Sequence, residues 1–342
     1  MEILSTHMIH GFKTAFAAVL AYSITILLKS EFGYWAVIST VIVMQVYVAD
    51  SVEMCLYRFS GTLIGATAGV LVILIIPKTD VFIGIALFVT IGICSFLTRY
   101  KTRYRMAAIT AVIIILTGIH TQDIFIFGIY RVFEICIGIL CAFLVSVLIF
   151  PRKRVDVLEN KLKNQSEECA RACITLVNAF NAKQQNVTED LVDDLVGDVW
   201  ENHALLHKIN QHEALIYHKK FAGNFHQKVG LMARSAEHLR NMVRTLNALE
   251  DDGFDIIMAQ ELADLARESG DTLVRIMKNE PIHANNSLAE MIAALDTKLL
   301  NLRKEGLIRR FDSPRLIQVF SFYSSLLYFT EDILAGTREM AV

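Results

Sequence analysis

The distribution of apolar and charged residues along the chain changes abruptly at Pro151. Before this residue, six apolar stretches approach the length of a membrane-spanning helix, which needs about 20 largely apolar residues to cross about 30 Å of hydrocarbon. They cover residues 12–29, 34–49, 59–76, 81–98, 106–120 and 130–150. Short segments with charged or turn-forming residues separate them, including one at Asp50 and Glu53. The pattern predicts an all-α membrane protein with a six-span transmembrane domain over residues 1–151.

After Pro151 the chain is more polar, and its hydrophobic residues follow a helical period. The residues on one face of a long first helix are Leu158, Leu162, Cys169, Cys173, Leu176 and Phe180. Polar or turn-forming residues interrupt the helical pattern near Asn186, Gly223, 251–253, 281–286 and 306–314. These interruptions divide the region into about five or six helices. We therefore expect residues 152–342 to form a helical bundle outside the membrane.

Positive charge gives the expected orientation. Basic residues gather in residues 99–105, between the fourth and fifth spans, and in residues 152–154, after the sixth. Because Lys and Arg close to a span are retained on the cytoplasmic side, both segments are predicted to be cytoplasmic. An even number of spans then places both termini, and with them the helical bundle, in the cytosol.

The six spans fall into two similar groups of three. Residues 57–69 (YRFSGTLIGATAG) align with residues 130–142 (YRVFEICIGILCA). Residues 35–43 (WAVISTVIV) likewise align with residues 106–114 (MAAITAVII). Because three is an odd number, the two groups have opposite orientations, and the sequence predicts an inverted 3+3 repeat. Transporters often contain such repeats, with the substrate site where the two groups meet.

Small residues follow one face of the third span. Gly61, Gly65 and Gly69 lie four residues apart, and the alignment matches Gly65 with Gly138 in the sixth span. A stripe of small residues lets another helix approach closely in lipid. We interpret these four glycines as helix-packing residues.

Charged residues inside the predicted spans are the main candidates for a functional site. Arg131 and Glu134 lie one helical turn apart in the sixth span, and Arg58 occupies the corresponding position in the third. A charge inside the bilayer is costly, so such residues usually face a partner, the bundle interior or water. One interpretation is that both arginines extend to the lipid headgroups, with Glu134 paired to Arg131. We favour a path for an anion lined by both arginines, with Glu134 as a counter-charge or proton acceptor.

Neutral polar residues in the spans are weaker candidates for the same path. They are Ser39, Thr40 and Gln45 in the second span and Thr110 in the fifth. Each side chain offers a hydrogen-bond donor, but hydroxyl groups in spans often bond a carbonyl of their own helix. The alternative of local hydrogen bonding therefore stays open for these residues.

The sequence contains no motif for ATP hydrolysis, for a nucleotide cofactor or for a serine nucleophile. His203 and His207 have a spacing that can bind a metal, but no HExxH pattern or further ligand pair accompanies them. The net charge of −2, without a basic run interleaved with aromatic residues, argues against nucleic acid as a partner. We predict no cofactor, no metal site and no enzymatic activity, so any transport would be driven by ion gradients.

Two motifs carry a family resemblance. Residues 33–36 (GYWA) begin the second span, and residues 58–65 (RFSGTLIG) begin the third. With six spans and a helical domain after them, the chain resembles the fusaric acid resistance and aromatic acid exporter superfamily. The resemblance implies export of aromatic carboxylic acids or related organic anions across a bacterial inner membrane. It extends distantly to the plant aluminium-activated malate transporters, and so implies an anion-conducting homodimer with Arg58 and Arg131 in the pore.

Two other functions stay open from the sequence. One is a passive anion channel, which would be unable to concentrate its substrate. The other is a membrane-anchored platform whose cytosolic helices bind a partner protein. Membrane lipid is an expected partner in every case, and a periplasmic adaptor protein is a further candidate for an exporter.

Overall fold

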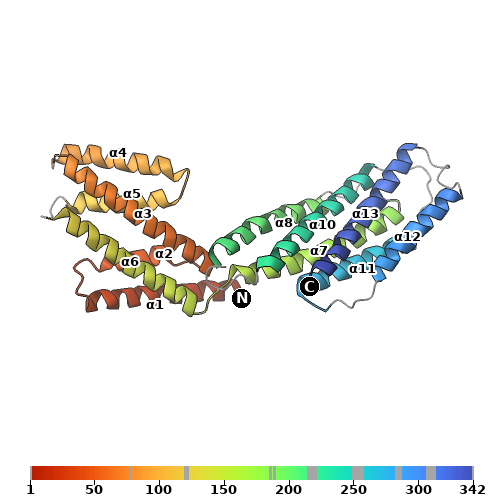
Figure 1. The fold of residues 1–342 in the computed structure, drawn as a ribbon, viewed down its shortest axis with the longest axis horizontal. Coiled ribbons are helices and arrows are strands. Elements are labelled where there is room, and N and C mark those ends of the chain that lie inside the picture. Colours follow the sequence, from red (N-terminus) through yellow and green to blue (C-terminus); the bar gives the residue numbers. More distant parts are fainter. Residues whose placement is uncertain are drawn as a thin grey trace. The chain divides into compact units, whose positions relative to one another are not determined.

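The computed structural model describes residues 2–77, 79–118, 123–184, 187, 190–213, 222–248, 258–281, 287–305 and 313–340. These residues form helices and connecting segments, with no strand among them. The chain divides into two compact units, unit 1 (Met1–Arg154) and unit 2 (Val155–Val342), as Figure 1 shows. The change from apolar to polar sequence at Pro151 therefore falls close to the boundary between the units.

The described part of unit 1 contains six apolar helices. They are α1 (Glu2–Leu27), α2 (Tyr34–Val43), α3 (Val48–Ile75), α4 (Asp80–Thr98), α5 (Arg103–Gly118) and α6 (Ile124–Leu148). Four of them, α1, α3, α4 and α6, are long and apolar enough to cross a membrane. The other two, α2 and α5, have 10 and 16 residues, which is shorter than a helix needs to cross the hydrocarbon alone.

The helix limits differ most from the predicted spans between α2 and α3. The sequence predicts a span through residue 49 and a loop at Asp50 and Glu53. Instead, α2 ends at Val43 and α3 begins at Val48, so both acidic residues lie inside α3 and the predicted loop is wrong. Residues 121 and 122, between the fifth and sixth predicted spans, lie outside the described residues, as does Lys78 between the third and fourth.

Local contacts explain the early start of α3. Asp50 lies in its first turn, where the positive end of the helix dipole favours an acidic residue. The Asp50 carboxylate accepts a bond from the Arg154 guanidinium at 2.5 Å, and that guanidinium lies over the Tyr47 ring. The backbone N–H of Gln45 donates to the Ser51 hydroxyl at 3.0 Å. Side chains thus satisfy the charges and donors of this segment, so α3 need not begin at an open loop.

The helices of unit 1 pack in matching pairs. α2 packs against α6 and α5 packs against α3, while α1 packs against α2 and α4 packs against α5 (Figure 1). In the predicted repeat, α2 corresponds to α5 and α6 corresponds to α3. Most contacts of the first three helices therefore have counterparts in the second three, with α3 and α6 in contact with each other. The exception is the packing of α1 against α6, because α4 makes no comparable contact with α3 among the described residues.

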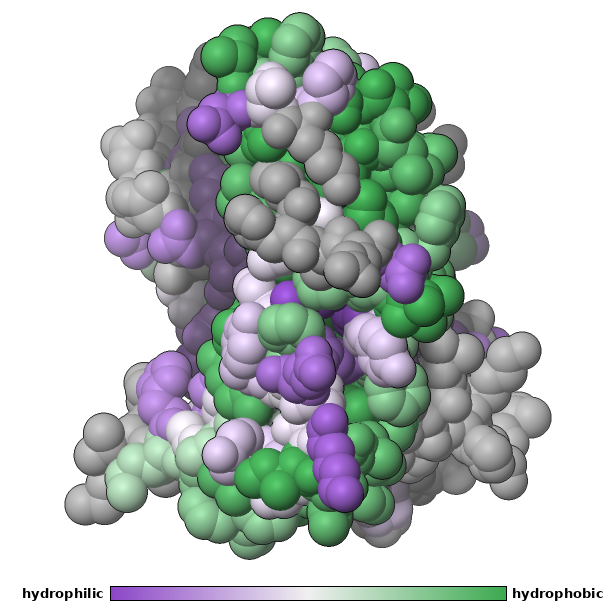
Figure 2. Space-filling view, turned by 90° about the vertical axis from the view of Figure 1, so that its left-hand side faces the viewer, coloured by the Kyte–Doolittle hydropathy of each residue, from purple (hydrophilic) through white to green (hydrophobic). Residues whose placement is uncertain are grey.

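The outside of unit 1 is apolar. Large hydrophobic side chains are exposed on all six helices, and on α4 they are Val81, Phe82, Ile85, Phe88, Val89, Ile91, Ile93 and Phe96. Figure 2 looks at the end of unit 1 drawn on the left of Figure 1, where hydrophobic residues surround a smaller group of hydrophilic ones. Such a surface is stable in lipid and unfavourable in water.

The described part of unit 2 is a bundle of six α-helices and one π-helical turn. They are α7 (Arg154–Asn181), α8 (Asp190–Lys208), η1 (Ile209–Glu213), α10 (Ala222–Ala248), α11 (Ala259–Lys278), α12 (Ser287–Lys304) and α13 (Ser313–Met340). The six residues that the sequence assigns to one face of the first helix are all buried in the core, from Leu158 to Phe180. Phe180 stacks on Phe322 of α13, with ring centroids 4.1 Å apart.

The predicted interruptions of this bundle fall mostly where the structure gives no description. Asn186, residues 251–253 and most of residues 281–286 and 306–314 lie outside the described residues. Gly223 lies at the start of α10, which begins at Ala222.

Candidate functional site

The two arginines of the predicted spans are buried inside unit 1. Arg58 is 0% exposed and Arg131 is 1% exposed, so neither side chain extends outward toward lipid headgroups. Both contact α2. The Arg58 Nη2 donates to the Ser39 hydroxyl at 3.3 Å, and the Arg131 Cζ lies 4.8 Å from the centroid of the Trp35 ring. Because Trp35 and Ser39 are four residues apart, the two guanidinium groups contact neighbouring turns of one helix.

Aromatic rings surround the Arg131 guanidinium. Its Cζ lies 4.9 Å from the ring centroids of both Phe32, in the α1–α2 connection, and Phe127 of α6, in addition to its contact with Trp35. A cation near the face of an aromatic ring is attracted by the ring quadrupole, most strongly where water is excluded. Three segments of the chain, in the α1–α2 connection, α2 and α6, thus hold one cation among three rings.

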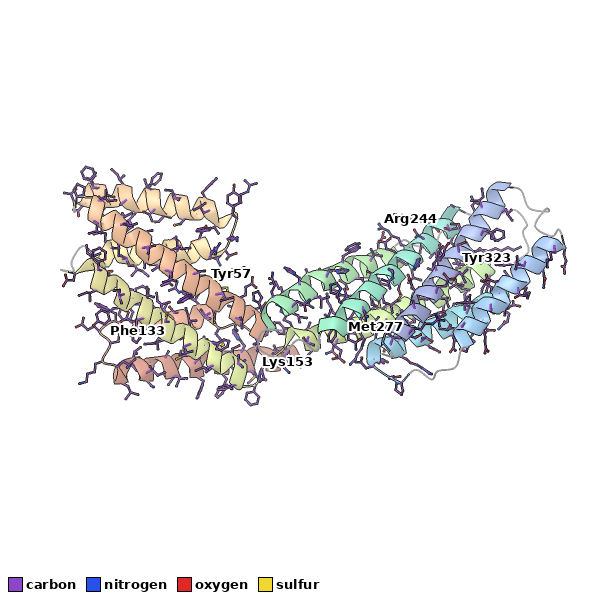
Figure 3. The ribbon with its side chains drawn as sticks, in the orientation of Figure 1. Tyr57, Phe133, Lys153, Arg244, Met277 and Tyr323 are labelled. Atoms are coloured by element: carbon purple, nitrogen blue, oxygen red, sulfur yellow. The ribbon has the colours of Figure 1, made fainter. Side chains whose placement is uncertain are left out.

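Glu134 is the counter-charge of Arg131. Its Oε2 lies 3.4 Å from the Arg131 Nη1, and its side chain is 2% exposed. The Ser30 hydroxyl donates to the other carboxylate oxygen, Oε1, at 2.5 Å. Figure 3 marks Phe133, which lies between the two charged residues on α6 and is exposed on the outside of the unit. Arg131 and Glu134 therefore face inward together, as their spacing of three residues requires.

Several donors at the Arg131 site are buried without a hydrogen-bond partner in the described structure. They are the Nε and Nη2 of Arg131 and the indole Nε1 of Trp35. A buried donor without a partner costs free energy, and each specific case calls for an explanation such as an absent ligand. The site thus has spare capacity to donate hydrogen bonds to an anion.

Arg58 has no such counter-charge among the described residues. Its Nη1 contacts only the weak acceptor Sδ of Met106 at 3.9 Å, and its Nε has no partner. No carboxylate in the described part of the chain lies within ion-pair distance of this guanidinium. The Thr62 hydroxyl, one turn further along α3, is also buried without a partner. Arg58 is therefore a buried cation whose charge is not balanced by any described residue around it.

The contacts of the two arginines correspond under the predicted repeat. The alignment matches Arg58 with Arg131, and Met106 with Trp35. Arg58 contacts Met106 and Arg131 contacts Trp35, so the two contacts are equivalent. The position matched to Glu134 is Gly61. The first group of helices therefore lacks the carboxylate that the second group has.

The predicted packing glycines lie where helices approach closely. A Cβ on Gly65 would stand 2.3 Å from the Ala107 carbonyl oxygen of α5, and a Cβ on Gly138 would stand 2.2 Å from the Ala36 carbonyl oxygen of α2. Ala36 and Ala107 also match in the alignment. Gly61 and Gly69 face α5 in the same way, next to Arg103 and Ile114.

The remaining polar candidates do not gather around the arginines, except for Ser39. The Thr40 hydroxyl donates to the carbonyl oxygens of Ala36 and Gly138, and the Thr110 hydroxyl donates to that of Met106. Both therefore take part in local and helix–helix contacts. Gln45 lies in the α2–α3 connection, where its amide group donates to the Ile42 carbonyl.

Comparison with models of known protein families shows which family this chain belongs to. The model of the Fusaric acid resistance protein family matches residues 7–317, which is most of the chain. The chain belongs to this family. Family membership and the four long apolar helices together make it a helical membrane protein.

Among curated relatives of this family member are subunits of p-hydroxybenzoic acid efflux pumps. The chain is 28% identical over 176 residues to the AaeB subunit of Enterobacter cloacae subsp. cloacae, covering 47% of this chain and 27% of the relative. It is 27% identical over 179 residues to the AaeB subunits of Escherichia coli O1:K1 and Shigella boydii serotype 18, covering 48% of this chain and 27% of each relative. The match thus spans about a quarter of the length of these relatives.

The sequence does not indicate every residue at the site of this family member. Phe127 precedes Arg131 by four residues, so its place on the same helix face is a usable signal. Phe32 and Ser30 approach Arg131 and Glu134 only because the α1–α2 connection folds over α6, which no local pattern indicates. Lys13 is a further buried cation, 2% exposed, whose Nζ donates to the Ser146 carbonyl near the end of α6 at 3.3 Å.

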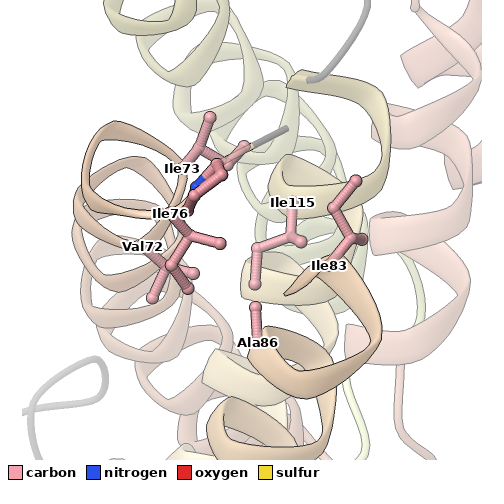
Figure 4. A pocket seen from close by; sticks show the side chains of 7 residues that line it. Val72, Ile73, Ile76, Ile83, Ala86 and Ile115 are labelled. Atoms are coloured by element: carbon pink, nitrogen blue, oxygen red, sulfur yellow. The ribbon is translucent and has the colours of Figure 1, made fainter. Parts of the chain in front are cut away.

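A small apolar pocket between α3, α4 and α5 is not a candidate for the anion site. In Figure 4, Val72 and Ile73 of α3, and Ile76 just after it, face Ile83 and Ala86 of α4 and Ile115 of α5. Its volume of about 10 Å³ is no more than one water molecule needs, and its lining offers no charged group.

Unit 2 shows no group of three metal-ligating side chains within its described residues. Its two cysteines are fully buried on α7, and burial raises the pKa of the Cys173 thiol to about 12 and that of Cys169 well above its usual value. Thiols with raised pKa values carry little thiolate and are poor nucleophiles.

Proposed function

We propose that this protein exports aromatic carboxylates, or related organic anions, across a bacterial inner membrane. In this proposal six helices of unit 1 span the membrane as an inverted repeat, unit 2 lies in the cytosol, and two chains form a homodimer. An ion gradient drives export without enzymatic chemistry. Family membership and the efflux function named for the AaeB relatives support the proposal at the level of substrate class.

The observation that carries the proposal is the aromatic surrounding of Arg131. A guanidinium group binds a carboxylate through two parallel N–H donors, and two of its nitrogens are without partners here. The rings of Phe32, Trp35 and Phe127 lie within 4.9 Å of the guanidinium carbon, so they are placed to contact an aromatic ring attached to that carboxylate. An aromatic carboxylate would use both features, whereas an aliphatic one would use the charge alone.

Arg58 extends the anion path. A buried charge without a partner is expensive, and the cost falls when an oppositely charged group binds beside it. Arg58 and Arg131 contact neighbouring turns of α2, so an anion could move from one to the other along this helix. By the predicted orientation, Arg58 lies toward the cytosolic side and receives the substrate first.

Transport in proteoliposomes tests the proposal. Purified wild-type protein is reconstituted, and flux of labelled p-hydroxybenzoate, benzoate and malate is measured with and without a pH gradient. The same assay is run on Arg131→Ala and on Arg105→Ala, a matched control because Arg105 is exposed at the start of α5. We expect wild type and Arg105→Ala to accumulate the aromatic anions under a gradient, and Arg131→Ala to lose most of this flux.

Other outcomes would favour the alternatives. Flux of aromatic anions that never exceeds equilibrium would indicate a passive channel. An Arg131→Ala variant that is monodisperse in detergent and transports like wild type would contradict the role of Arg131. No flux from a folded wild-type protein would contradict transport itself and favour a platform that binds a partner through unit 2.

A further inference from the structure

The two matched arginines differ in one respect, which is the presence of a carboxylate. Arg131 has Glu134 at 3.4 Å, whereas the position matched to Glu134 beside Arg58 is a glycine, Gly61. Packing explains the glycine, because a Cβ at Gly61 would lie 2.6 Å from the Arg103 carbonyl oxygen. Packing does not explain the glutamate, because moving a carboxylate out of water costs free energy even when it is paired with a cation. The asymmetry therefore calls for a role of Glu134 itself.

Glu134 neutralises the same guanidinium group that a substrate carboxylate would bind. Its Oε2 approaches a single guanidinium nitrogen of Arg131 at 3.4 Å, while charge-assisted hydrogen bonds are usually about 2.7–2.9 Å long. The Nε and Nη2 of the same guanidinium have no hydrogen-bond partner among the described residues. The internal pair is thus long and engages one donor, and a free carboxylate that engages two would bind better once Glu134 no longer competes.

Ser30 holds the carboxylate from its other side. Its hydroxyl donates to the Glu134 Oε1 at 2.5 Å. A hydroxyl can also accept a hydrogen bond, so Ser30 can stay bonded to Glu134 when the carboxyl group carries a proton. Glu134 therefore has a partner in both protonation states, while Arg131 has its counter-charge in only one.

We propose that Glu134 couples anion export to proton uptake, by occupying Arg131 when ionised and vacating it when protonated. This inference rests on the proposed function. A proton from the outer side binds the Glu134 carboxylate, which becomes a neutral acid, and the substrate carboxylate replaces it as the counter-charge of the Arg131 guanidinium. Loss of that proton toward the cytosol restores the internal pair and displaces the substrate outward. Each cycle moves one carboxylate out and one proton in.

Other titratable or charged groups on the neighbouring elements are less suited to this role. In the α1–α2 connection, at the start of α2 and at the start of α6 they are Lys29, Glu31, Tyr34, Asp123 and Tyr130. Elsewhere on the elements around α6 they are His7, His10, Lys13 and Tyr22 on α1, Asp50, Glu53, Tyr57 and Arg58 on α3, and Arg103, Tyr104 and Arg105 on α5. Lys13 bonds the Ser146 carbonyl, 12 residues or about 18 Å further along α6 than Glu134. The guanidinium of Arg58 stays charged at ordinary pH. The groups in the α1–α2 connection and at the starts of α2 and α6 are exposed, and the acids of α3, Asp50 and Glu53, are half-buried. Glu134 is therefore the fully buried acid of this set.

The chain provides its own optical probe of this site. It contains two tryptophans, Trp35 beside Arg131 and Trp200 on α8 of unit 2, which is 59% exposed. A Trp200→Phe background therefore leaves Trp35 as the sole tryptophan. Its fluorescence is titrated with benzoate in full-length detergent-solubilised protein, over a pH range in which benzoate stays ionised.

In this background, benzoate should bind more tightly as the pH falls, because protonation of Glu134 frees Arg131. Glu134→Gln should bind benzoate about tenfold more tightly than the parent near neutral pH, the effect of one competing hydrogen bond to a charged group, and should lose the pH dependence. Gln keeps an oxygen that can accept the Ser30 bond. Glu31→Gln, an exposed glutamate in the α1–α2 connection, is the matched control and should behave like the parent.

Transport separates coupling from binding. In proteoliposomes, Glu134→Gln should carry benzoate down its concentration gradient but should not accumulate it against one when a pH gradient is imposed. Ser30→Ala, which keeps the charge of Glu134 but removes its second partner, should shift the pH dependence of binding without abolishing it. This second variant keeps the inference testable if Glu134→Gln is not recovered as a monodisperse protein.

Failure of the proposed function and failure of the Glu134 role would give different results. If the parent neither binds nor transports benzoate, the proposed function fails. If the parent binds benzoate and accumulates it under a pH gradient, and Glu134→Gln retains both the pH dependence and the accumulation, the proposed function stands and the coupling role of Glu134 is wrong.

Discussion

Unit 1 and unit 2 arrange apolar and charged residues in opposite ways. Unit 1 exposes large hydrophobic side chains, especially on α4, and buries Lys13, Arg58 and Arg131. Unit 2 has a hydrophobic core of leucine, methionine and phenylalanine side chains, and the charged residue buried in its described part is Lys228. The apolar outside of unit 1 matches lipid, and the charged outside of unit 2 matches water.

The buried cations show what the difference means for function. Lys228 of unit 2 donates to the Met277 carbonyl and to the Asn279 side chain at the C-terminal end of α11, where the helix dipole favours a cation. Lys13 of unit 1 donates to a carbonyl near the end of α6 in the same manner. Arg131 has Glu134, and Arg58 has no carboxylate among the described residues. Of these four buried cations, the two arginines are the ones with donors that lack a partner among the described residues. The charged interior of unit 1 thus contains both structural and candidate functional cations.

The largest loss of stability from a single substitution is expected in the hydrophobic core of unit 2. Phe322→Ala removes a fully buried ring that stacks on Phe180, and it should lower the free energy of unfolding by about 3–5 kcal/mol. Tyr328→Ala, on the same helix but 56% exposed, should change it much less. Both free-energy changes are measured by urea titration of the full chain in detergent, with proteolytic cleavage of unit 2 as the readout of unfolding. Equal effects of the two substitutions would contradict the assigned core.

A smaller but clear effect is expected where the helices of unit 1 pack. Gly138→Val adds a side chain whose Cβ would stand 2.2 Å from a backbone oxygen of α2, which cannot rotate away as a side chain does. Overpacking of this kind costs about 1–3 kcal/mol or more. Gly92→Val on α4 is the matched control, since nothing lies within 4 Å of its added Cβ.

The two glycine variants are compared by heating them in detergent and measuring how much protein stays monodisperse at each temperature. Gly138→Val should unfold at a lower temperature than wild type, and Gly92→Val should unfold near the wild-type temperature. If Gly138→Val were as stable as wild type, the close contact of α2 with α6 would be wrong, and with it the matching contacts of the two groups of helices.

The smallest expected effect concerns the buried cation of unit 2. Burial lowers the pKa of Lys228 from its usual value of 10.5, with Glu159 acting in the opposite direction. The folded protein therefore binds this proton more weakly than the unfolded chain, and the Lys228 contribution to the unfolding free energy rises with pH as the pH approaches 10.5. Lys228→Met should lose about 1–2 kcal/mol of stability from its two hydrogen bonds.

The difference between wild type and Lys228→Met should consequently grow as the pH is raised toward the usual lysine pKa. Urea titrations at several pH values measure it. Lys278→Met, which removes a surface ion pair with Glu167, is the control and should change stability by less than about 1 kcal/mol without this trend. A difference for Lys228→Met that shrinks with rising pH would contradict the buried environment assigned to Lys228.

Helical periodicity in the sequence predicted the core face of α7 correctly, because one amphipathic helix repeats a local pattern of side chains. The same reasoning predicted the wrong start for α3. Asp50 and Glu53 resemble a loop in sequence, but Asp50 is neutralised by Arg154, which lies 104 residues later. A contact at that sequence distance leaves no trace in the local pattern, so the boundary could not be placed from hydropathy alone.

The sequence by itself determined the apolar and polar halves, the inward-facing spacing of Arg131 and Glu134, the glycine stripe and the alignment of the two groups of helices. These are local or repeated features, and a helix of fixed pitch converts spacing directly into a shared face. Only the tertiary structure decided that both arginines are fully buried, that three rings surround Arg131 and that Ser30 bonds Glu134. It also decided that no carboxylate of the described residues lies beside Arg58. Each of these depends on which helix packs beside which, because burial and charge balance are set by neighbours from distant parts of the chain.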